Sequence, residues 1–253
     1  RVAMASPLWL DKLRAVPIIG FRFTPLYVSN TSLLDLAQPI VNRWIEATHK
    51  PDIRFDSPTQ LTLDVGNGYS FIAGSELLNG QFNYRAKVTT TPNQDPVVTT
   101  NPAEPYTDLV EKVSEQTLQL FDALYKKSPR RLRRVGIVAN TAFSPDKVVP
   151  GVQSLIDHLG DPWVNGLENY NSMLSVVLQR RDTWHEKCHH TIRRDHVEDE
   201  SSVDQVLLTL DWQRVYVEPE AVSLQKLRQI VAQCTTDAYK YFETFGMGDL
   251  KYE

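Results

Sequence analysis

The sequence predicts an α+β fold in which an antiparallel sheet carries helices on one face. Segments rich in strand-forming residues follow one another with short turns between them, which is typical of an antiparallel meander. Segments with helical periodicity are separate from these groups of strands and lie before or after them in the sequence. The order strand, helix, three strands, helix occurs twice in the 253 residues. We therefore expect an internal duplication of a β-α-β-β-β-α unit.

In the first half, Gly66-Asn67-Gly68 is the strongest local signal, because Asn-Gly is typical of a tight hairpin turn. Pro39 lies inside a helical pattern and is expected to bend the helix or delay its start. Four prolines between 92 and 105 predict a loop. The expected elements are a strand over 16–26, a helix over 33–45, strands over 60–65, 69–73 and 81–89, and a helix over 106–125.

In the second half, Ser223 is expected to cap a long amphipathic helix that Gly246 ends. Glu198, Asp199 and Glu200 form an acidic loop between two strands. The expected elements are a strand over 133–143, a helix from 144–146 to Gly160, strands over 172–181, 184–194 and 203–217, and the helix that starts at Ser223.

The two proposed halves, 1–127 and 128–253, are expected either as two lobes or as one merged domain. A shift of 116 residues places Gly20 on Gly136 and brings most of the expected elements close together. Residue identity between the halves is poor, so the duplication rests on the order of elements alone.

Composition narrows the class of protein. The chain is 42% hydrophobic and 23% charged, which is typical of a folded protein and excludes collagen-like and wholly disordered chains. The net charge of −4 does not favour a molecule that coats a polyanion with its whole surface. Cys188 and Cys234 have no CxxC partner, which favours a reducing compartment. Charged residues interrupt the apolar N-terminal stretch, so we expect a cytoplasmic protein without a membrane segment.

Histidines cluster between 185 and 196, where His185, Cys188, His189, His190 and His196 fall together with Glu186. Imidazole, thiolate and carboxylate are ligands of zinc. Strand alternation, however, places His185 and His189 on one face and Cys188 and His190 on the other. The alternatives are therefore a solvated strand without a cofactor, a site for zinc or another divalent metal, or another functional use of this segment. Strand carboxylates such as Asp64, Asp204 and Asp211 are a weaker candidate for a magnesium site.

Two arginine-rich segments form a candidate surface for a polyanion such as a nucleic acid. If the strands over 172–181 and 184–194 form a hairpin with Trp184 at its turn, 180–181 and 193–194 are expected to be neighbours. The alternative is that these charges only keep the surface soluble. The candidate residues are Arg130, Arg131, Arg133, Arg134, Arg180, Arg181, Arg193 and Arg194.

Three segments carry a resemblance: PIIGFRF (17–23), LRRVGIVANTAF (132–143) and the stretch from LLTLDWQ to YKYFETF (207–245). They resemble landmarks of a sporadically distributed, uncharacterised bacterial family of about this length. The family's central strand usually reads closer to RvGlRyiN, which Ala139 and Asn140 match only in part. The resemblance implies a small accessory protein with no established activity, and it carries over no catalytic residue.

The sequence contains no GxSxG, HExxH or GK[ST] motif. We therefore expect a non-enzymatic binding or accessory protein that acts through protein or polyanion contacts. A protein partner or a homodimer is expected, and the aromatic last helix is either core or a dimer face. The alternative is a metal-dependent hydrolase or nuclease that uses the His185–His196 cluster.

Overall fold

The computed structural model describes residues 7–44, 52–89, 97–126, 129–144, 147–159, 170–195 and 205–250. Its first half comprises η1 (Trp9–Lys12), β1 (Val16–Phe23), α1 (Asn30–Trp44), β2 (Asp52–Ser57), β3 (Gln60–Gly66), β4 (Tyr69–Gly74), β5 (Leu77–Phe82), β6 (Ala86–Thr89), β7 (Val97–Thr100) and α2 (Tyr106–Tyr125). Its second half comprises β8 (Arg130–Phe143), α3 (Pro150–His158), β9 (Tyr170–Arg180), β10 (Trp184–Asp195), β11 (Gln205–Val222) and α4 (Leu224–Gly246).

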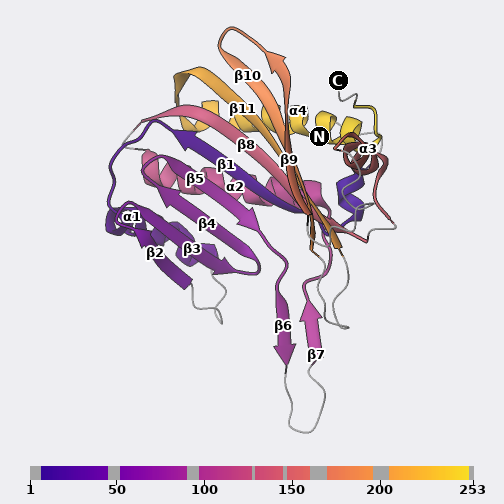
Figure 1. Cartoon of the computed structure of the whole chain (residues 1–253). Helices are drawn as coiled ribbons and strands as arrows, with labels where there is room; N and C mark the ends of the chain where they lie inside the picture. Colours follow the sequence, from indigo (N-terminus) through magenta and orange to yellow (C-terminus); the bar gives the residue numbers. More distant parts are fainter. Residues whose placement is uncertain are drawn as a thin grey trace.

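One antiparallel sheet of nine strands organises the molecule, in the order β2-β3-β4-β5-β1-β8-β11-β10-β9. Helices α1, α2 and α4 pack on it (Figure 1). The fold class predicted from the sequence is confirmed. None of the described helices has the length and apolar character needed to cross a membrane.

The centre of the sheet is the antiparallel pair of β1 and β8, in which Gly20 lies opposite Gly136. Outward from this pair the order is β5, β4, β3 and β2 on one side, and β11, β10 and β9 on the other. The two proposed halves therefore share one continuous sheet. The internal duplication itself stays a prediction, which superposition of 16–127 on 133–246 would test.

Several boundaries in the first half were predicted wrongly. The expected strand over 81–89 is two strands, because the chain leaves the sheet after Phe82 and continues as β6. β6 pairs with β7 in a ribbon that extends away from the sheet, and β7 lies inside the expected loop over 92–105. β2 lies in a segment where we expected no strand. In the second half, α3 begins at Pro150, later than expected.

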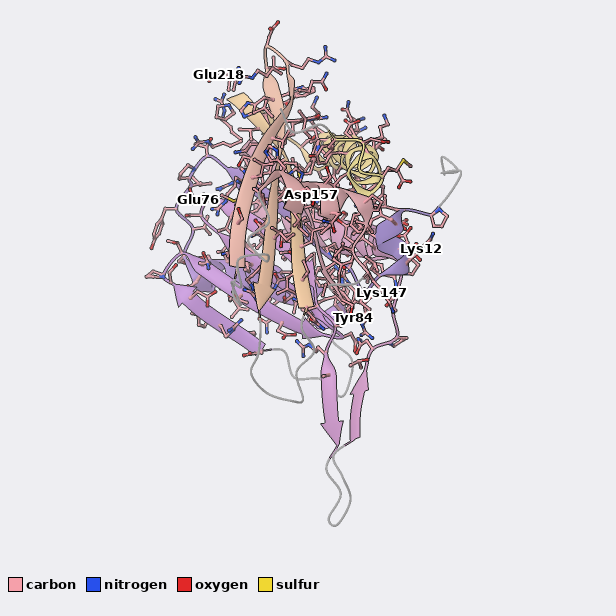
Figure 2. The ribbon with its side chains drawn as sticks, turned by 45° about the vertical axis from the view of Figure 1, so that its right-hand side comes forward. Lys12, Glu76, Tyr84, Lys147, Asp157 and Glu218 are labelled. Atoms are coloured by element: carbon pink, nitrogen blue, oxygen red, sulfur yellow. The ribbon has the colours of Figure 1, made fainter. Side chains whose placement is uncertain are left out.

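The base of the ribbon is fixed by Tyr84, which Figure 2 labels. The Tyr84 hydroxyl accepts a hydrogen bond from the Glu104 backbone N–H at 3.1 Å. The Arg14 guanidinium lies 4.1 Å from the centre of the Tyr84 ring and donates to the Asn101 carbonyl at 2.9 Å. These contacts tie the ribbon to the chain just before β1.

Strand alternation explains why the helices cover only one face. Ile19, Phe21 and Phe23 of β1 are buried, while the residues between them are only half-buried. α2 packs over β1 and β5, α1 over β3 and β4, and α4 over β8 and β11. Among the described elements no helix packs on the opposite side of the sheet. We call that side the open face.

Candidate functional site: the open face of the sheet

One cross-strand row of the open face is rich in basic side chains. Arg22 of β1 lies opposite Arg134 of β8, and across Val215 the row continues to His185 and Arg180. Directly opposed residues of neighbouring strands share a face. Five strands about 4.8 Å apart span about 19 Å. We call Arg22, Arg134, His185 and Arg180 the basic row.

The next row along the strands is flatter. It contains Gly20, Gly136, Gln213, Lys187 and Val177. The two glycines leave the centre of the sheet without side chains beside the basic row. Lys187, half-buried, adds a further cation to this region.

A hydrogen-bonded chain fixes the orientation of Arg134. Its guanidinium donates to Gln213 Oε1 at 3.2 Å, and the Gln213 amide donates to Asp211 Oδ2 at 2.6 Å. Burial raises the pKa of the Asp211 carboxyl, while the Gln213 amide and then the charge of Arg134 act in the opposite direction. Arg134 is thus held by a neutral amide, and among the described contacts no carboxylate forms an ion pair with it, although the charge of Asp211 also acts on its guanidinium.

A third row brings Asp211, His189 and Ser175 into line. The Ser175 hydroxyl and His189 Nδ1 lie 2.5 Å apart. Burial, followed by the charge of Lys187, lowers the pKa of His189. Among the described contacts no hydrogen bond joins His189 to Asp211. The row therefore has the residue types of a nucleophilic triad without the geometry that such a triad needs.

β10 divides the predicted histidine and cysteine cluster between the two faces, as alternation predicts. His185 and His189 lie on the open face, whereas Cys188 and His190 are fully buried on the helix side. Burial raises the pKa of the Cys188 thiol well above its usual value, which disfavours the thiolate that binds metals. In the described part of the chain no three His, Cys, Asp or Glu side chains are grouped for a metal ion. His196 lies outside the described residues.

His190 belongs to the core. Its Nε2 lies 2.6 Å from the Tyr241 hydroxyl, and its ring stacks on Phe245 with centroids 5.1 Å apart. Burial lowers the pKa of His190 to about 4. A neutral imidazole packed under α4 has a structural role.

The arginines around 130 have different environments. Arg130 is buried, donates to the carbonyls of Thr24 and Ser75, and lies 4.9 Å from the Tyr125 ring centre. Its side chain is therefore enclosed by the protein and offers nothing to a polyanion. Arg131 is exposed and donates to the Pro219 carbonyl at 2.9 Å. Arg133, also exposed, is the extra residue of a bulge beside the basic row.

The expected proximity of 180–181 to 193–194 is wrong. β9 and β10 do form a hairpin, but Arg180 lies opposite His185 and Arg193 lies opposite Asn171. The strands continue away from the turn after Trp184, so the two arginine pairs lie at opposite ends of the hairpin. Eight residues at about 3.3 Å each separate them by about 26 Å. Arg181, at the turn, lies 6.0 Å from the Trp184 ring centre.

The side chain of Arg194 lies outside the described residues. Sequence reasoning missed Arg22 and Lys187, whose places on the open face follow from alternation once the strand register is known. Neither residue belongs to a basic run, so only the pairing register of the strands shows that both lie beside the other basic side chains.

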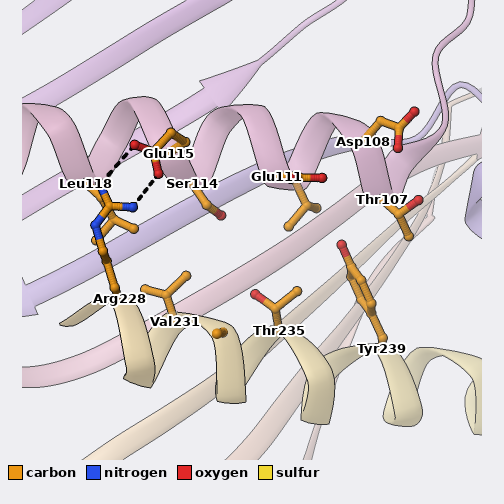
Figure 3. Close-up of a pocket in the computed structure, with 12 residues that line it drawn as sticks. Thr107, Asp108, Glu111, Ser114, Glu115, Leu118, Arg228, Val231, Thr235 and Tyr239 are labelled. Carbon is orange, nitrogen blue, oxygen red and sulfur yellow. Dashed lines mark hydrogen bonds and ion pairs between the residues drawn. The ribbon is translucent and has the colours of Figure 1, made fainter. Parts of the chain in front are cut away.

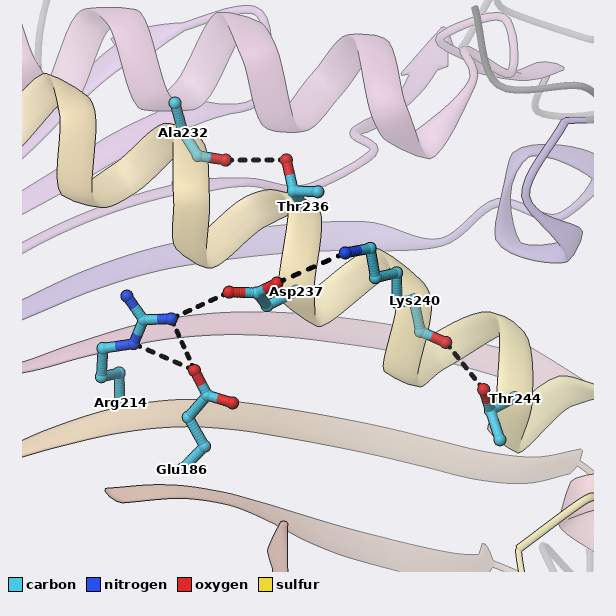
Figure 4. A network of polar contacts seen from close by, with 7 residues as sticks. All are labelled: Glu186, Arg214, Ala232, Thr236, Asp237, Lys240 and Thr244. Carbon is cyan, nitrogen blue, oxygen red and sulfur yellow. Dashed lines mark hydrogen bonds and ion pairs between the residues drawn. The ribbon is translucent and has the colours of Figure 1, made fainter. Parts of the chain in front are cut away.

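The helix side of the sheet contains a buried charged network that the sequence did not suggest (Figure 4). Arg214, whose side chain is 3% exposed, donates to Glu186 Oε1 at 2.6 and 3.0 Å. It also donates to Asp237 Oδ2 of α4 at 2.9 Å, and its guanidinium lies 4.3 Å from the Trp184 ring centre. The bond to Asp237 thus fixes α4 to the sheet, and the bonds to Glu186 join β11 to β10. The sequence did contain an indication of this network. Arg214 continues the alternating series Leu208, Leu210 and Trp212, so alternation alone places its charge on the buried face.

A groove of about 460 Å³ lies between α2 and α4 (Figure 3). Val110, Val231 and Tyr239 line it, and the ion pair of Arg228 with Glu115, at 2.5 and 2.9 Å, joins the two helices across it. The pair adds to the ring contacts of Tyr106 with Tyr239 and Phe242, which also join the two helices.

Comparisons with protein-family models, curated proteins and solved structures found no match to this chain.

Proposed function

We propose that the protein is a non-enzymatic binding protein that holds a phosphate-bearing polyanion on the open face of its sheet. The observation that carries the proposal is the basic row, in which Arg22, Arg134, His185 and Arg180 are aligned across five strands. A linear row of arginine side chains suits a linear chain of phosphates, because guanidinium groups bind phosphate through paired hydrogen bonds.

The charge around the row supports this assignment. Lys187 lies in the next row on the open face, and Asp211, one row further along, is bonded to Gln213. Arg22 is paired with Glu76 at 3.1 Å, so Arg134, Lys187 and Arg180 are the main contributors. This local excess occurs in a chain whose net charge is −4, so binding is confined to one face.

The test is a fluorescence anisotropy titration of the full chain with labelled single-stranded DNA and RNA of about 20 nucleotides, alongside duplexes. We expect micromolar binding at low salt and an affinity that falls steeply with salt concentration. Arg180→Glu should weaken binding and reduce the salt slope by about 1. The matched control is Arg43→Glu, which makes the same charge change at an exposed position of α1.

Absence of binding in the micromolar range at low salt, or an equal loss with Arg43→Glu, would contradict the proposal. A chelator distinguishes the alternative. A metal-dependent hydrolase or nuclease would lose its action with EDTA, whereas contacts made by arginine and lysine would persist.

A further inference from the structure

The outer edge of β9 has the features of an interface. β9 is the last strand of the sheet, and in the described part of the chain no strand pairs with its outer side. Residues 170–177 carry no charged side chain and no proline, and the register shift of β9 lies beyond them, between Val177 and Gln179. Proteins normally protect such an edge with charge, proline or a bulge, because its free backbone groups can pair with another strand.

The two edges of the sheet differ in this respect. β2, at the other edge, carries Asp52, Arg54 and Asp56 among six residues. Charges on a short edge strand oppose pairing with a further strand. β9 has eleven residues and carries a charge only at its last residue, Arg180.

The exposed apolar side chains of β9 are arranged symmetrically. Met173 is 65% exposed and Val177 is 51% exposed. They flank Ser175 at equal spacing, and residues 173–177 pair regularly with β10, so all three side chains lie on the open face. An antiparallel two-fold axis through Ser175 would place each Met173 opposite the partner's Val177.

We propose that β9 pairs with β9 of a second copy of this chain, about a two-fold axis at Ser175. The pairing satisfies the free backbone groups of both edges and covers four exposed apolar side chains. No like charges meet, because residues 173–177, the stretch that pairs regularly on both sides of the axis, are all uncharged. The result is a continuous sheet in which two open faces lie side by side. The inference goes beyond polyanion binding and does not depend on it.

The test of the interface is the mass of the full chain in solution, measured by light scattering during size exclusion over a range of concentrations. We expect twice 28.9 kDa for the natural sequence and 28.9 kDa for Val177→Lys. Val217→Lys is the matched control, because Val217 of β11 is 60% exposed and outside the proposed interface. A monomer for the natural sequence overturns the proposal and leaves the edge for a strand of another protein. An unchanged dimer with Val177→Lys overturns it as well.

The test of the register is a disulfide. Ser175→Cys should form a covalent dimer under mild oxidation, because residues at the axis face their own copies. The natural cysteines do not interfere, since Cys188 and Cys234 are buried and their thiol pKa values are raised, that of Cys234 to about 12. A dimer that gives no cross-link at Ser175 contradicts the proposed axis.

Discussion

Arg214 and Arg134 lie on neighbouring strands of the same sheet and have opposite surroundings. Arg214 faces the helices, and Glu186 and Asp237 neutralise it. Arg134 faces the open side, and a neutral amide, Gln213, orients it. A guanidinium already bound by two carboxylates has little to offer a phosphate, while one held by an amide keeps its charge available. The face of the sheet on which an arginine lies therefore determines whether its side chain stabilises the fold or is available to bind a ligand.

The largest effect should follow from breaking the buried network. Arg214→Met removes the cation and leaves the Glu186 carboxylate buried without its partner. Such a change typically costs about 3–5 kcal/mol of unfolding free energy. Urea unfolding followed by circular dichroism measures this cost.

The double variant Arg214→Met with Glu186→Leu should regain most of the lost stability, because no unpaired carboxylate is left at the fully buried position. Asp237, the other partner of Arg214, is 29% exposed and keeps Lys240 at 3.8 Å. Arg134→Met on the open face is the control and should cost less than about 1 kcal/mol. A loss at Arg134 equal to that at Arg214 would show that the two faces do not differ as described.

The next effect concerns histidines on opposite faces of β10. The pKa of His190 is about 4 in the folded protein, against about 6.5 in an unfolded chain. The unfolded state therefore takes up the proton first as the pH falls, so stability is lost between about pH 6.5 and pH 4. The full loss from this group is about 3 kcal/mol.

Unfolding free energies measured across this pH range test the prediction. His190→Phe together with Tyr241→Phe removes the titrating group and the hydroxyl that contacts it. This double variant should lose less stability on acidification than the natural sequence. His189→Asn, on the open face, removes a histidine whose pKa burial lowers by less, so it should flatten the slope less than the double variant does. Equal flattening by the two variants would contradict the assignment to His190.

Much of the fold could be predicted because local signals agree with the tertiary structure. The helix over 106–125 matches α2, and Ser223 caps α4 by accepting a hydrogen bond from the Lys226 N–H at 3.2 Å. The turn at Gly66-Asn67-Gly68 has the positive φ angles that Asn-Gly favours. These signals depend on neighbours in sequence, so one chain is enough to read them.

The candidate site was less predictable because it depends on register. Arg130 and Arg134 belong to one basic run, but Arg130 is buried and Arg134 faces the open side. The basic row joins β1, β8 and the β9–β10 hairpin, three segments that are far apart in sequence. Nothing local indicates which residue of β1 lies opposite which residue of β8. The error about 180–181 and 193–194 came from treating neighbours in sequence around a hairpin as neighbours in space.

The smallest effect compares two glycines on opposite faces of the sheet. On the helix side, a Cβ at Gly80 would collide with Thr117 Oγ1 of α2 and lie 3.0 Å from Phe71 Cε1. On the open face, the nearest atom to a Cβ at Gly136 is Asp211 Oδ1, at an ordinary contact distance of 3.7 Å. Gly80→Ala should therefore cost about 1–3 kcal/mol of unfolding free energy. Gly136→Ala should be neutral or stabilise by about 0.5–1 kcal/mol, because alanine has less backbone entropy to lose.

Thermal and urea unfolding of both variants measure the difference, and a third variant identifies its cause. If the loss of unfolding free energy in Gly80→Ala is caused by the collision with Thr117, adding Thr117→Ala removes the Oγ1 atom. Part of the lost free energy should then be recovered. The same Thr117→Ala added to Gly136→Ala should give no such recovery, because the two positions lie on opposite faces. Equal costs at Gly80 and Gly136 would mean that the open face is as tightly covered as the helix side, which contradicts both the fold description and the binding surface proposed on it.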